Sequence, residues 1–437
     1  MSKSIKNQDA ILQKLKIEQL NPMQLEAIKA INSSPEVILL SPTGTGKTLA
    51  FLLPIIAELD PSSEEVQAII IVPSRELAIQ IEQVCREMGT GFKINAVYGG
   101  QSFSKDRLNL KHRPAILIGT PGRVAAHLRR DSFAKEDISI LILDEFDKSL
   151  EIGFKDEMNE IVSYLNYLQK KILTSATQKI EVPEFLGLND PIKIDYLVDK
   201  INDKLEMKII NSPDKDKLNI LVRTINHLGD QPGIIFCNFK NSIKRVSDCL
   251  TKFDISHGCF HGGMDQADRE RTLIKFRNGT HQLLLATDLA ARGLDIPEMN
   301  FIIHYHLPNR KDEFIHRNGR TARMFKGGTS FIFRWKTEKM PEYMDITPSE
   351  KMPSAPAAKP SKWSTLFITG GRKDKISKGD IAGLFFKQAN LDKDQLGIIE
   401  LGQDCAYVAV LSSMADKLVR KLNNRRLKTK KVRIYKL

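Results

Sequence analysis

The sequence lacks the features that mark exported or membrane-bound chains. None of its apolar runs reaches the roughly 18 residues that a membrane-spanning helix needs, and the polar segment Met1–Asn7 has no apolar stretch of the kind that a secretory signal requires. The five cysteines are scattered and odd in number, with no C-x-x-C pair. That pattern argues against a disulfide framework or a zinc site and fits a reducing compartment. We therefore expect a soluble, cytoplasmic protein that does not contact a membrane.

The composition indicates a folded chain of more than one domain. Its 437 residues exceed the usual length of one domain, and 41% hydrophobic with 27% charged residues is typical of globular proteins. The net charge of +13 is concentrated near the end, where residues 362–437 hold 17 Lys and Arg against 7 Asp and Glu. Such a basic module points to a polyanion, with nucleic acid the leading candidate and a solubilising tail the alternative.

The first 196 residues alternate apolar runs with helical patterns. The apolar runs cover residues 37–40, 68–72, 115–118 and 138–143, and a helical pattern covers residues 74–87. Continuous apolar runs suit the strands of a parallel sheet that is covered on both faces. Residues 1–196 are therefore predicted to form an α/β domain. The charged segment 197–208, which contains no Gly or Pro, is predicted to connect it to the next domain.

A second α/β series and then a change of composition follow. Apolar runs at residues 233–237, 282–286, 300–304 and 329–333 predict a second parallel-sheet domain over residues 205–338. Five prolines between residues 340 and 362 predict a linker over residues 339–362. The last segment, 363–437, has a βαββαβ pattern, which is the ferredoxin-like order of RNA-recognition modules. Its strands are expected at 365–369, 397–401, 405–411 and 431–435, and its helices at 378–390 and 414–422.

Residues 41–48, Ser-Pro-Thr-Gly-Thr-Gly-Lys-Thr, match the phosphate-binding loop pattern G-x-x-x-x-G-K-[ST], with Ser41 at the first glycine position. Gly44 and Gly46 allow backbone amides to surround phosphates at a helix N-terminus. Lys47 can neutralise the β- and γ-phosphates, and Thr48 can ligate Mg²⁺. The alternative is a plain glycine-rich turn, but the order strand, loop, helix favours a nucleotide site.

Four residues at the end of the strand 138–143 add carboxylates to this site. They read Asp144-Glu145-Phe146-Asp147, and the carboxyl end of a parallel strand faces the ligand crevice of an open α/β sheet. Asp144 suits a Mg²⁺ ligand, and Glu145 suits the group that orients or deprotonates the attacking water. The alternative role of these acids, as helix N-caps, would be preferred if no phosphate-binding loop were present.

A third motif, residues 316–323, reads His-Arg-Asn-Gly-Arg-Thr-Ala-Arg. If the segment is helical, Arg320 and Arg323 share one face because they are three residues apart. The pair could reach a phosphate from the second domain as arginine fingers. An exposed basic helix is the alternative.

The ordered set of motifs resembles the DEAD-box ATP-dependent RNA helicases over essentially the whole chain. In the first domain the resemblance is carried by Pro22–Gln24, the loop 41–48, the signature box 144–147, Ser175-Ala-Thr177, and the segments 73–78, 99–100 and 120–123. In the second domain it is carried by residues 266–269, 286–295 and 316–323. The segments 366–375, 379–381 and 406–410 and the basic end are similar to the RNA-binding domain of DbpA-type helicases.

The resemblance implies a fold, cofactors and roles. It implies two tandem RecA-like domains of the P-loop NTPase class, with ATP and Mg²⁺ between them, and a small RRM-like α+β domain. The implied catalytic residues are Lys47, Glu145, Arg320 and Arg323. The implied nucleotide-binding residues are Gln24 at the adenine, Thr43, Gly44, Thr45, Gly46, Lys47 and Thr48 at the phosphates, and Asp295 at the ribose. Thr48 and Asp144 would hold the metal, and Asp147, Ser175, Thr177 and His316 would couple the nucleotide to domain closure.

RNA is the partner that the resemblance implies. The core residues expected to hold RNA phosphates are Arg75, Gly100, Thr120, Arg123, Arg269 and Thr287. Those expected in the C-terminal domain are Lys373, Lys375, Arg425, Arg426 and Lys428. DbpA-type helicases are bacterial and are linked to assembly of the large ribosomal subunit through a hairpin of 23S rRNA, so 23S rRNA or a pre-ribosomal particle is the implied target. We expect a monomer, because nothing in the sequence suggests a coiled coil.

The sequence departs from the family pattern in the core. Phe146 replaces the alanine of the signature box, and we expect a locally adjusted pocket around the larger ring. No aromatic residue precedes Gln24 to stack on adenine, so Ile5 or Ile11 would have to cover the base. His306 stands where many members have aspartate, and with His304 it forms an H-x-H pair; two strand-end histidines are a better interpretation than a metal site without a third ligand.

The C-terminal domain departs from the RNA-recognition pattern in its aromatic residues. The stretch 403–410 offers only Tyr407, where an RNP1 motif has several rings. Broad base stacking on the sheet is therefore not expected, and recognition is expected to use basic loops and the basic end.

Three hypotheses follow from these patterns. The first is an ATP-dependent RNA helicase, and the second is an ATP-gated RNA clamp or scaffold with little unwinding, suggested by Phe146 and the missing aromatic. The third is a DNA translocase, which a dependence on the 2′-hydroxyl would distinguish. The helicase is favoured because every phosphate-handling residue is present.

Overall fold

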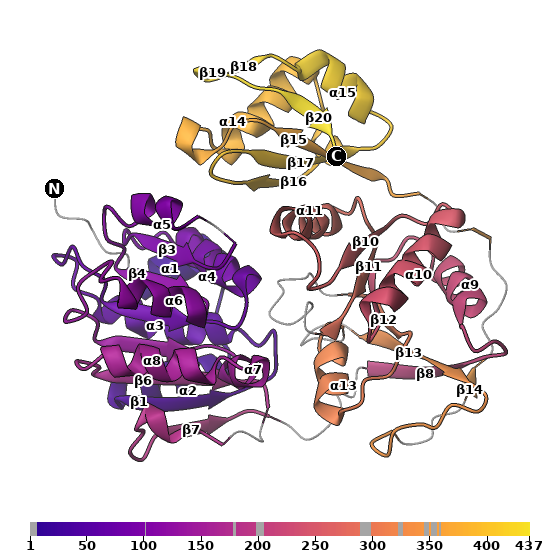
Figure 1. The fold of residues 1–437 in the computed structure, drawn as a ribbon. Coiled ribbons are helices and arrows are strands. Elements are labelled where there is room, and N and C mark those ends of the chain that lie inside the picture. Colours follow the sequence, from indigo (N-terminus) through magenta and orange to yellow (C-terminus); the bar gives the residue numbers. More distant parts are fainter. Residues whose placement is uncertain are drawn as a thin grey trace. The chain divides into compact units, whose positions relative to one another are not determined.

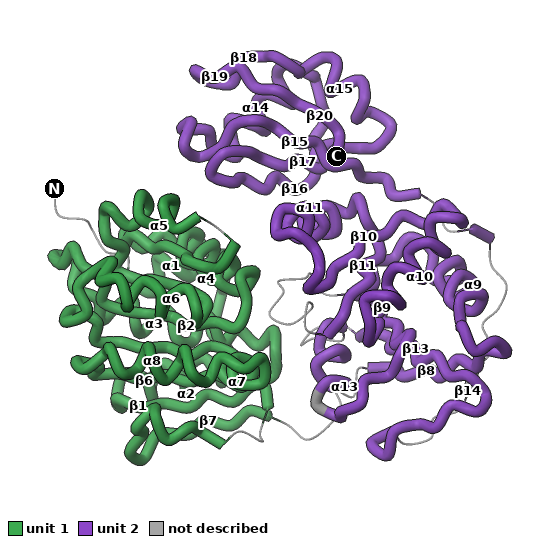
Figure 2. The backbone as a smooth tube through the Cα atoms, viewed as in Figure 1, with its two compact units in different colours: residues 1–200, 292–295 green, residues 201–291, 296–437 purple. Residues whose placement is uncertain are grey.

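The computed structural model describes residues 7–100, 102–177, 181–197, 205–288, 299–321, 327–344, 349–350, 356–357 and 360–437. The described residues up to 197 form one compact unit, and those from 205 onward form a second (Figure 2). Across these ranges no helix is long and apolar enough to cross a membrane.

The first unit is built on a seven-stranded parallel sheet with strand order β3-β4-β2-β5-β6-β1-β7 (Figure 1). The strands are β1 (Glu36–Leu40), β2 (Ala68–Ile71), β3 (Ile94–Val97), β4 (Ile116–Gly119), β5 (Ile140–Leu143), β6 (Lys170–Ser175) and β7 (Ile192–Asp195). The α-helices are α1 (Gln8–Leu15), α2 (Pro22–Ser33), α3 (Lys47–Glu58), α4 (Arg75–Met88), α5 (Phe103–Asn109), α6 (Pro121–Arg129), α7 (Phe146–Ile152) and α8 (Lys155–Tyr164), and a 3₁₀ turn covers Glu184–Leu186.

Burial on both faces explains the continuous apolar strands. All five residues of β1 are buried, and successive side chains enter opposite cores because side chains alternate along a strand. Val37 and Leu39 pack with α2, α3 and α4, whereas Ile38 and Leu40 pack with α6, α7 and α8. A strand without a polar face can fold only in such a three-layer arrangement.

The four strands predicted for this unit are present, within one or two residues of their predicted ends. Three further strands, β3, β6 and β7, were not predicted. β3 and β7 lie at the two edges of the sheet, where part of each strand stays accessible, so their apolar signal is weak. β6 is central, but it opens with Lys170 and Lys171, which interrupt the apolar run.

The second unit contains another parallel sheet of seven strands in the order β10-β11-β9-β12-β13-β8-β14. Its strands are β8 (Leu205–Ser212), β9 (Gly233–Phe236), β10 (His257–Phe260), β11 (Leu283–Ala286), β12 (Phe301–His304), β13 (Gly328–Trp335) and β14 (Ser349–Glu350). Its helices are α9 (Leu218–Leu228), α10 (Lys240–Lys252), α11 (Gln266–Arg277) and α13 (Lys311–Asn318). The predicted connection 197–208 was too long, because Leu205–Lys208 belong to β8, which pairs with β13 along its whole length.

The predicted linker 339–362 also needs correction at its start. Met340, Tyr343 and Met344 pack with Phe314 and Ile332 of the second sheet domain, and the Tyr343 hydroxyl donates a 2.5 Å hydrogen bond to the Pro308 carbonyl. Further along, β14 pairs with β8. Proline content alone indicated a spacer, but the apolar side chains between the prolines bury against the domain.

Residues from 363 onward form a small domain with a four-stranded sheet of order β16-β17-β15-β20. Its strands are antiparallel: β15 (Trp363–Ile368), β16 (Leu396–Leu401), β17 (Ala406–Leu411) and β20 (Ile434–Lys436). The helices α14 (Lys378–Gly383), continued by a π turn over Leu384–Gln388, and α15 (Ala415–Leu422) cover one face. A short hairpin, β18 (Arg426–Leu427) and β19 (Lys430–Lys431), precedes β20. The predicted βαββαβ order is present, with this hairpin added.

The packing of Phe146 gives a first prediction. Its ring is 1% exposed and lies in the core beneath α7 and α8. We expect Phe146→Ala to leave a cavity and to lower the free energy of unfolding of the first unit by about 3–5 kcal/mol, measured by urea denaturation followed by circular dichroism. Phe253→Ala, at an exposed position, is the matched control and should change stability by less than about 0.5 kcal/mol. Equal effects of the two variants would contradict the packing argument.

Candidate active site and nucleic-acid interface

One edge of the first sheet collects the predicted site residues. Because the strands are parallel, the segments that follow them all leave from the same edge. Along that edge, in spatial order, lie Gly100 after β3, Thr120 after β4, Arg75 after β2, Asp144 after β5, Thr177 after β6 and Lys47 after β1. The residues predicted to hold RNA therefore occupy one half of the edge, and those predicted to hold the nucleotide occupy the other.

The loop 41–48 turns sharply between β1 and α3. Gly44 and Gly46 have φ angles of 83° and 86°, which only glycine adopts without strain. The Lys47 ammonium is buried and donates hydrogen bonds to the carbonyls of Ser41, at 2.5 Å, and Pro42, at 2.9 Å. No side chain caps the N-terminus of α3, so its first amides and the ammonium lie at the same end of the helix, where an anion is favoured.

Gln24 links α2 to this loop. Its Nε2 donates to the Gly46 carbonyl at 3.2 Å, and its Oε1 accepts from the Asn21 amide in a capping box. A side chain at position 46 would collide with Gln24, since a Cβ there would lie 2.4 Å from Nε2. Asn21 makes a second hydrogen bond to the loop, which its Nδ2 donates to the Thr45 carbonyl at 2.9 Å. The sequence identified Gln24 but missed Asn21, whose signal was its N-cap position before Pro22.

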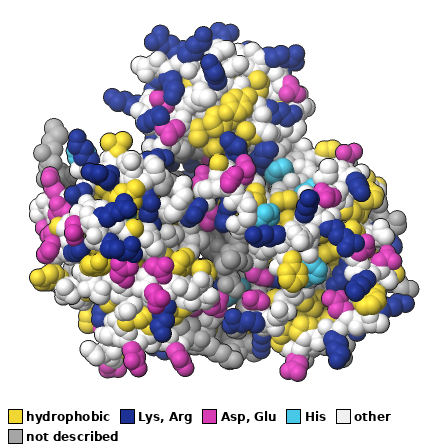
Figure 3. All heavy atoms as spheres, viewed as in Figure 1, with side chains coloured by type: hydrophobic (Ala, Val, Ile, Leu, Met, Phe, Trp, Pro, Cys, Tyr) yellow, Lys and Arg dark blue, Asp and Glu magenta, His cyan; other side chains and the backbone are white. Residues whose placement is uncertain are grey.

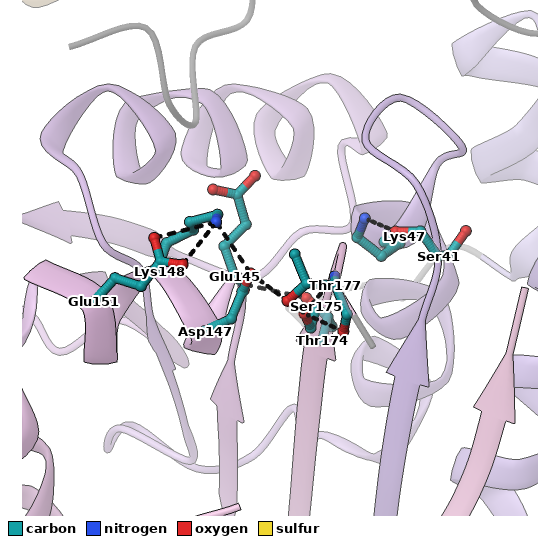
Figure 4. A network of polar contacts seen from close by, with 9 residues as sticks. All are labelled: Ser41, Lys47, Glu145, Asp147, Lys148, Glu151, Thr174, Ser175 and Thr177. Carbon is teal, nitrogen blue, oxygen red and sulfur yellow. Dashed lines mark hydrogen bonds and ion pairs between the residues drawn. The ribbon is translucent and has the colours of Figure 1, made fainter. Parts of the chain in front are cut away.

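Asp144 and Glu145 follow β5 with different environments. Asp144 is buried and accepts a hydrogen bond from the Thr174 hydroxyl; burial raises the pKa of its carboxyl, against the Thr174 bond and the Lys47 charge. Glu145 has a φ of 49° and stands at the N-cap position of α7. Its side chain makes no capping hydrogen bond there and points away from the strand ends (Figure 4). The N-cap alternative is therefore not supported for Glu145.

Asp147 is joined to the segment after β6 (Figure 4). The Thr177 hydroxyl donates to Asp147 Oδ2 at 3.1 Å, and Ser175 Oγ accepts from the Thr177 amide at 2.9 Å. Lys148, which the sequence did not single out, lies 3.5 Å from the same carboxylate and bridges it to Glu151. This chain of contacts connects the signature box to the Ser175-Ala-Thr177 motif, as the resemblance implied.

In the other half of the edge, Arg75 lies against the glycine pair 99–100. A Cβ at Gly100 would be 2.5 Å from its Nη1, so the glycine gives the guanidinium room. Arg75 begins α4, where Ser74 caps the helix. Thr120 directly precedes α6, the neighbouring segment after β4, and its side chain makes no capping hydrogen bond. The two helix starts and the loop after β3 are thus adjacent.

Arg123 is held by groups that sequence reasoning missed. Its Nε and Nη2 each lie 2.7 Å from Asp106 Oδ2, and its guanidinium stacks on the Phe103 ring at 4.8 Å. Asp106 is 1% exposed and also contacts His127 Nε2 at 3.3 Å. Because a buried carboxylate needs a charged partner, Asp106 fixes the position of Arg123.

In the second domain, Arg269 and Thr287 both contact Phe260. The Arg269 guanidinium lies over the Phe260 ring at 4.6 Å, and the Thr287 amide donates to the Phe260 carbonyl at 3.4 Å. Phe260 thus links the two residues of this domain that were predicted to hold RNA phosphates.

The motif 316–323 differs from its predicted helix. α13 ends at Asn318, and Arg320 follows in a turn whose carbonyl accepts from the Met299 amide. Arg320 and Arg323 were expected to share one face if the segment were helical. Arg320 lies beyond Asn318, where the helix ends, so that condition is not met. His316 lies in its last turn. Arg323 and Asp295 lie outside the described residues.

Arg317, which the sequence did not single out, is the centre of this region. It is 2% exposed and forms a two-pronged contact with Asp288, in which Nε and Nη2 each lie 2.5 Å from a carboxylate oxygen. Nη2 also donates to Asn238 Oδ1 at 2.8 Å, and Nη1 donates to the His306 carbonyl at 2.5 Å. The guanidinium is thereby satisfied by the ends of β9, β11 and β12.

The two strand-end histidines are structural. His304 Nε2 contacts Asn318 Oδ1 at 3.2 Å, and His306 Nδ1 accepts from the Asn238 amide at 3.4 Å. Burial, followed by the nearby charge of Arg317, lowers the pKa of His304 to about 3. Within the described ranges no group of three or more His, Cys, Asp or Glu residues could hold a metal ion. These contacts favour the structural interpretation over the H-x-H metal site.

The basic residues predicted in the C-terminal domain gather around one hairpin. Lys428, at the β18–β19 turn, donates to the Lys375 carbonyl at 2.6 Å and pairs with Asp380 at 2.8 Å. Arg425 and Arg426 lead into the hairpin. Lys373 lies in the neighbouring 3₁₀ turn and pairs with Asp404.

The C-terminal sheet has more aromatic rings side by side than the single Tyr407 of the stretch 403–410 indicated. Phe367 on β15 is paired in register with Tyr407 on β17 and Tyr435 on β20. Its ring stacks on Tyr435 at 4.8 Å and meets Tyr407 edge-on at 5.3 Å. We call these three residues the aromatic row. Only register places them together, because they are far apart in the sequence; Figure 3 shows hydrophobic side chains gathered on this domain among lysines and arginines.

Family comparisons agree with this geometry. Residues 21–185 match the family described as DEAD/DEAH box helicase, residues 216–325 match the helicase conserved C-terminal domain, and residues 365–436 match the DbpA RNA binding domain. The chain is 31% identical to the ATP-dependent RNA helicase DbpA of Escherichia coli, with 95% of this chain and 94% of that protein covered. The Bacillus subtilis DbpA is 29% identical with the same coverage. The chain therefore belongs to the DEAD-box ATP-dependent RNA helicases, and within them it is of the DbpA type.

Solved structures show the same core. S. cerevisiae Dbp5 bound to RNA and ADP BeF3 is 26% identical, with a TM-score of 0.67 over 76% of this chain and 88% of that one. The DEAD-box helicase Mss116 bound to ssRNA and UDP-BeF is 28% identical, with a TM-score of 0.68 over 76% of this chain and 74% of that one. These likenesses confirm the predicted pair of RecA-like domains.

The buried Arg317–Asp288 pair gives a second prediction. Asp288→Asn removes the negative charge while keeping the shape, and it leaves the guanidinium buried without its counter-charge. We expect the free energy of unfolding of the second domain to fall by about 3–5 kcal/mol, measured by denaturant-dependent hydrogen exchange of β9, β11 and β12. Asp216→Asn, which breaks the exposed pair with Arg245, should cost less than about 1 kcal/mol. Similar losses for both variants would show that Asp288 does not have this role.

Proposed function

We propose that this protein uses ATP hydrolysis to unwind or remodel structured RNA locally, acting on rRNA during assembly of the large ribosomal subunit. The observation that carries the proposal is the single sheet edge at which the glycine loop 41–48, two carboxylates and the residues predicted to contact RNA follow neighbouring parallel strands. A DbpA-type RNA-binding domain on the same chain adds a second contact with RNA.

The nucleotide half of the edge would supply the phosphate-binding, metal-binding and water-activating groups for phosphoryl transfer. Lys47 and the amides of residues 43–48 would hold the phosphates, since they lie together at the start of α3. Glu145 would orient and deprotonate the attacking water, and its side chain is not used as a helix cap. Gln24, whose Nε2 donates a hydrogen bond to the Gly46 carbonyl, would select adenine. Arg320, Arg323 and Asp295 would complete the site from the second domain.

Thr48 and Asp144 fit a magnesium ion by their chemistry. Both offer oxygen ligands, which Mg²⁺ prefers, and the ion usually keeps several waters beside one or two carboxylates. The buried Asp144 carboxyl, whose pKa is raised by burial, is a group that a cation would stabilise in its charged form. Bound there, the metal would neutralise charge on the phosphates. Thr174 would hold Asp144 in position.

The Asp147–Thr177 hydrogen bond provides a path for coupling. Asp147 belongs to the same turn as Glu145, and Thr177 belongs to the segment that follows β6. Asp147 Oδ1 is buried and has no hydrogen-bond partner, so one oxygen remains to bind a group from elsewhere. Phe146 was one of the two reasons to consider an ATP-gated clamp, beside the missing aromatic, but its ring is buried and Asp147 still reaches Thr177. These contacts favour the helicase over the clamp.

The RNA target is proposed from the C-terminal domain. Lys375 and Lys428 form a basic surface at the hairpin, and the aromatic row adds rings on which unpaired bases can stack. Phosphate contacts made by Arg75, Gly100, Thr120, Arg123, Arg269 and Thr287 would position RNA without reading its sequence. The two relatives that are similar over nearly the whole chain are named ATP-dependent RNA helicases, which supports RNA as the substrate. The choice of rRNA, and of the cytoplasm as the place of action, rests on the resemblance of the C-terminal motifs to the DbpA type.

The catalytic assignment is tested with Glu145→Gln. We expect RNA-stimulated ATP turnover to fall about 10²–10⁴-fold, because general-base assistance is worth that much, while nucleotide affinity changes little. Steady-state ATPase and nucleotide binding would be measured at fixed salt, since phosphate-driven RNA binding depends on salt. Glu151→Gln on the same helix is the matched control. Undiminished turnover in Glu145→Gln, or RNA binding by the parent chain without any stimulation of turnover, would overturn the enzyme assignment.

The rRNA assignment is tested through the aromatic row. We expect a 23S rRNA fragment to stimulate turnover more than a generic duplex does, and Phe367→Ala with Tyr435→Ala to weaken its binding. Each lost ring should cost about 1–3 kcal/mol, the usual value of one stacked base, measured by fluorescence anisotropy. Tyr167→Ala, at an exposed position of the first unit, is the control. Equal stimulation by every RNA would leave a helicase without rRNA preference.

A further inference from the structure

A hollow of about 870 Å³ lies on the surface of the first unit, between α5 and the turn that follows α6. We call it the α5 hollow. Its volume is within the range of pockets that hold a ligand with several chemical groups. Four basic side chains line it, those of Arg107, Lys111, Arg113 and Arg130. Figure 3 shows lysine and arginine side chains gathered on this face of the first unit.

Little negative charge offsets these basic groups. Asp131 is the only acidic residue among the described residues that line the hollow, and its carboxylate is already paired with Lys135 at 2.6 Å. Glu65 lies 3.6 Å from Arg113. A concave surface with an excess of one charge attracts ligands of the opposite charge, so the α5 hollow suits a polyanion.

Apolar side chains lie among the basic ones. Leu108 is 72% exposed, and Phe103 and Leu110 also line the hollow. A small inorganic anion would make no use of these groups. A nucleic-acid strand would use both kinds, because its phosphates pair with basic side chains and its bases pack on apolar or aromatic ones. The mixture therefore favours a strand over a free anion.

The Phe103 ring connects the hollow to a residue that was predicted to hold RNA. The guanidinium carbon of Arg130 lies 4.1 Å from the centre of this ring, and that of Arg123 lies 4.8 Å from the same centre. Stacking uses the flat face of a guanidinium and leaves N–H groups at its edge to donate to phosphate oxygens. Arg130 is exposed, so its edge is accessible to a ligand in the hollow.

The direction of the two helices shows where the hollow leads. α5 and α6 follow the neighbouring strands β3 and β4, so both start near the sheet edge that collects the predicted RNA contacts (Figure 1). Arg107 lies one turn after Phe103 on the same face of α5, and Lys111 follows the end of that helix. The nine residues of α6 span about 14 Å. A strand held at Thr120 and Arg123 could thus continue along α5 away from the edge.

Basic residues near helix ends can also have a purely structural role, because they interact favourably with the helix dipole. Arg113 has such a role, since it donates to the Leu110 carbonyl at the end of α5, at 2.6 Å. Arg129 and Arg130 lie side by side at the end of α6 but point to different partners. Arg129 makes two hydrogen bonds to Glu160, at 2.6 and 2.9 Å, whereas Arg130 lines the hollow.

We propose that the α5 hollow is an additional RNA-binding site of the first unit, in which Arg107, Lys111 and Arg130 hold phosphates of a strand that continues past Arg123. Leu108 packs against the ribose or base of the same segment. The site deepens the function proposed above and rests on it. Because phosphates carry no sequence information, the site accepts any RNA that is long enough to reach it.

The salt dependence of RNA binding tests the site. Each phosphate contact contributes roughly 0.7 on a single strand to the slope of log affinity against log salt concentration. We therefore expect Arg107→Gln with Arg130→Gln to lower the magnitude of this slope by about 1.4. Fluorescence anisotropy of the full chain with ADP BeF3 would measure it on a strand twice as long as the shortest one that fully stimulates the parent's ATP turnover. An unchanged slope would overturn the proposal.

Strand length provides an internal control. The shortest stimulating strand is held at the sheet edge and does not reach the hollow, so the double variant and the parent should bind it with the same slope. An equal loss on short and long strands would contradict an additional site along α5.

Arg129→Gln is the matched control for Arg130→Gln. The two substitutions remove the same charge from the same helix end, but only Arg130 lines the hollow. We expect the slope to fall in Arg130→Gln and to stay at the parent's value in Arg129→Gln. Equal falls would indicate a general effect of charge and would overturn the site. Thermal unfolding followed by circular dichroism would be measured on both; a lower midpoint for Arg130→Gln with an unchanged slope would assign it to the helix end instead.

A cross-linking experiment locates the RNA without depending on turnover. With 4-thiouridine placed in turn along the long strand, we expect one position to cross-link to the segment 103–113 of the parent chain, identified by mass spectrometry. Cross-links confined to other segments would overturn the RNA site and leave the hollow to an acidic protein partner. A parent chain that binds no RNA would contradict the proposed function itself, whereas RNA-stimulated turnover with no cross-link to this segment would contradict the additional site alone.

Discussion

The parallel alignment of the strands is the constraint on which the rest of the structure depends. A parallel strand must be followed by a crossover, so each motif leaves the sheet at its carboxyl edge and enters a helix on one face or the other. That requirement places Lys47, Asp144 and Thr177 on neighbouring strands although the first and last of them are 130 residues apart in the sequence. It also explains why both faces of the sheet need cores; one of these cores takes up the Phe146 ring, while Asp147 next to it contacts Thr177.

Within that frame, individual positions are fixed by satisfying buried polar groups. Thr174 donates a hydrogen bond to Asp144, and the carboxylates of Asp106 and Asp288 accept hydrogen bonds from Arg123 and Arg317. A buried charge without a partner is costly, so each of these pairs holds a functional segment more firmly than packing alone would. Gln24 and Asn21 act in the same way on the glycine loop, using neutral hydrogen bonds instead of charge. Gln24 and Asp288 lie in two of the motifs that carry the family resemblance, whereas Asn21, Asp106 and Thr174 lie outside those motifs.

Sequence reasoning predicted the parts that depend on local pattern. Continuous apolar runs located β1, β2, β4 and β5, and ordered motifs located the phosphate-binding loop and both carboxylates. Sequence reasoning failed where a structure depends on contacts between residues that are far apart in the sequence. The edge strands β3 and β7 have too few buried residues to give a clear pattern, and the start of the predicted linker is held by Met340 and Tyr343 against residues far earlier in the chain. The aromatic row shows the same limit, since Phe367, Tyr407 and Tyr435 become neighbours only through strand register.

The environment of Arg317 also bears on how the second domain folds. Its guanidinium is satisfied by groups at the ends of three different strands, β9, β11 and β12. A partly assembled sheet that buried this arginine would lack at least one of those partners and would contain an uncompensated charge. Intermediates of that kind are too unfavourable to accumulate, so the strands are expected to come together in one cooperative step. Any partly open form that keeps this arginine buried without one of its partners is therefore costly, which favours opening of the three strands together.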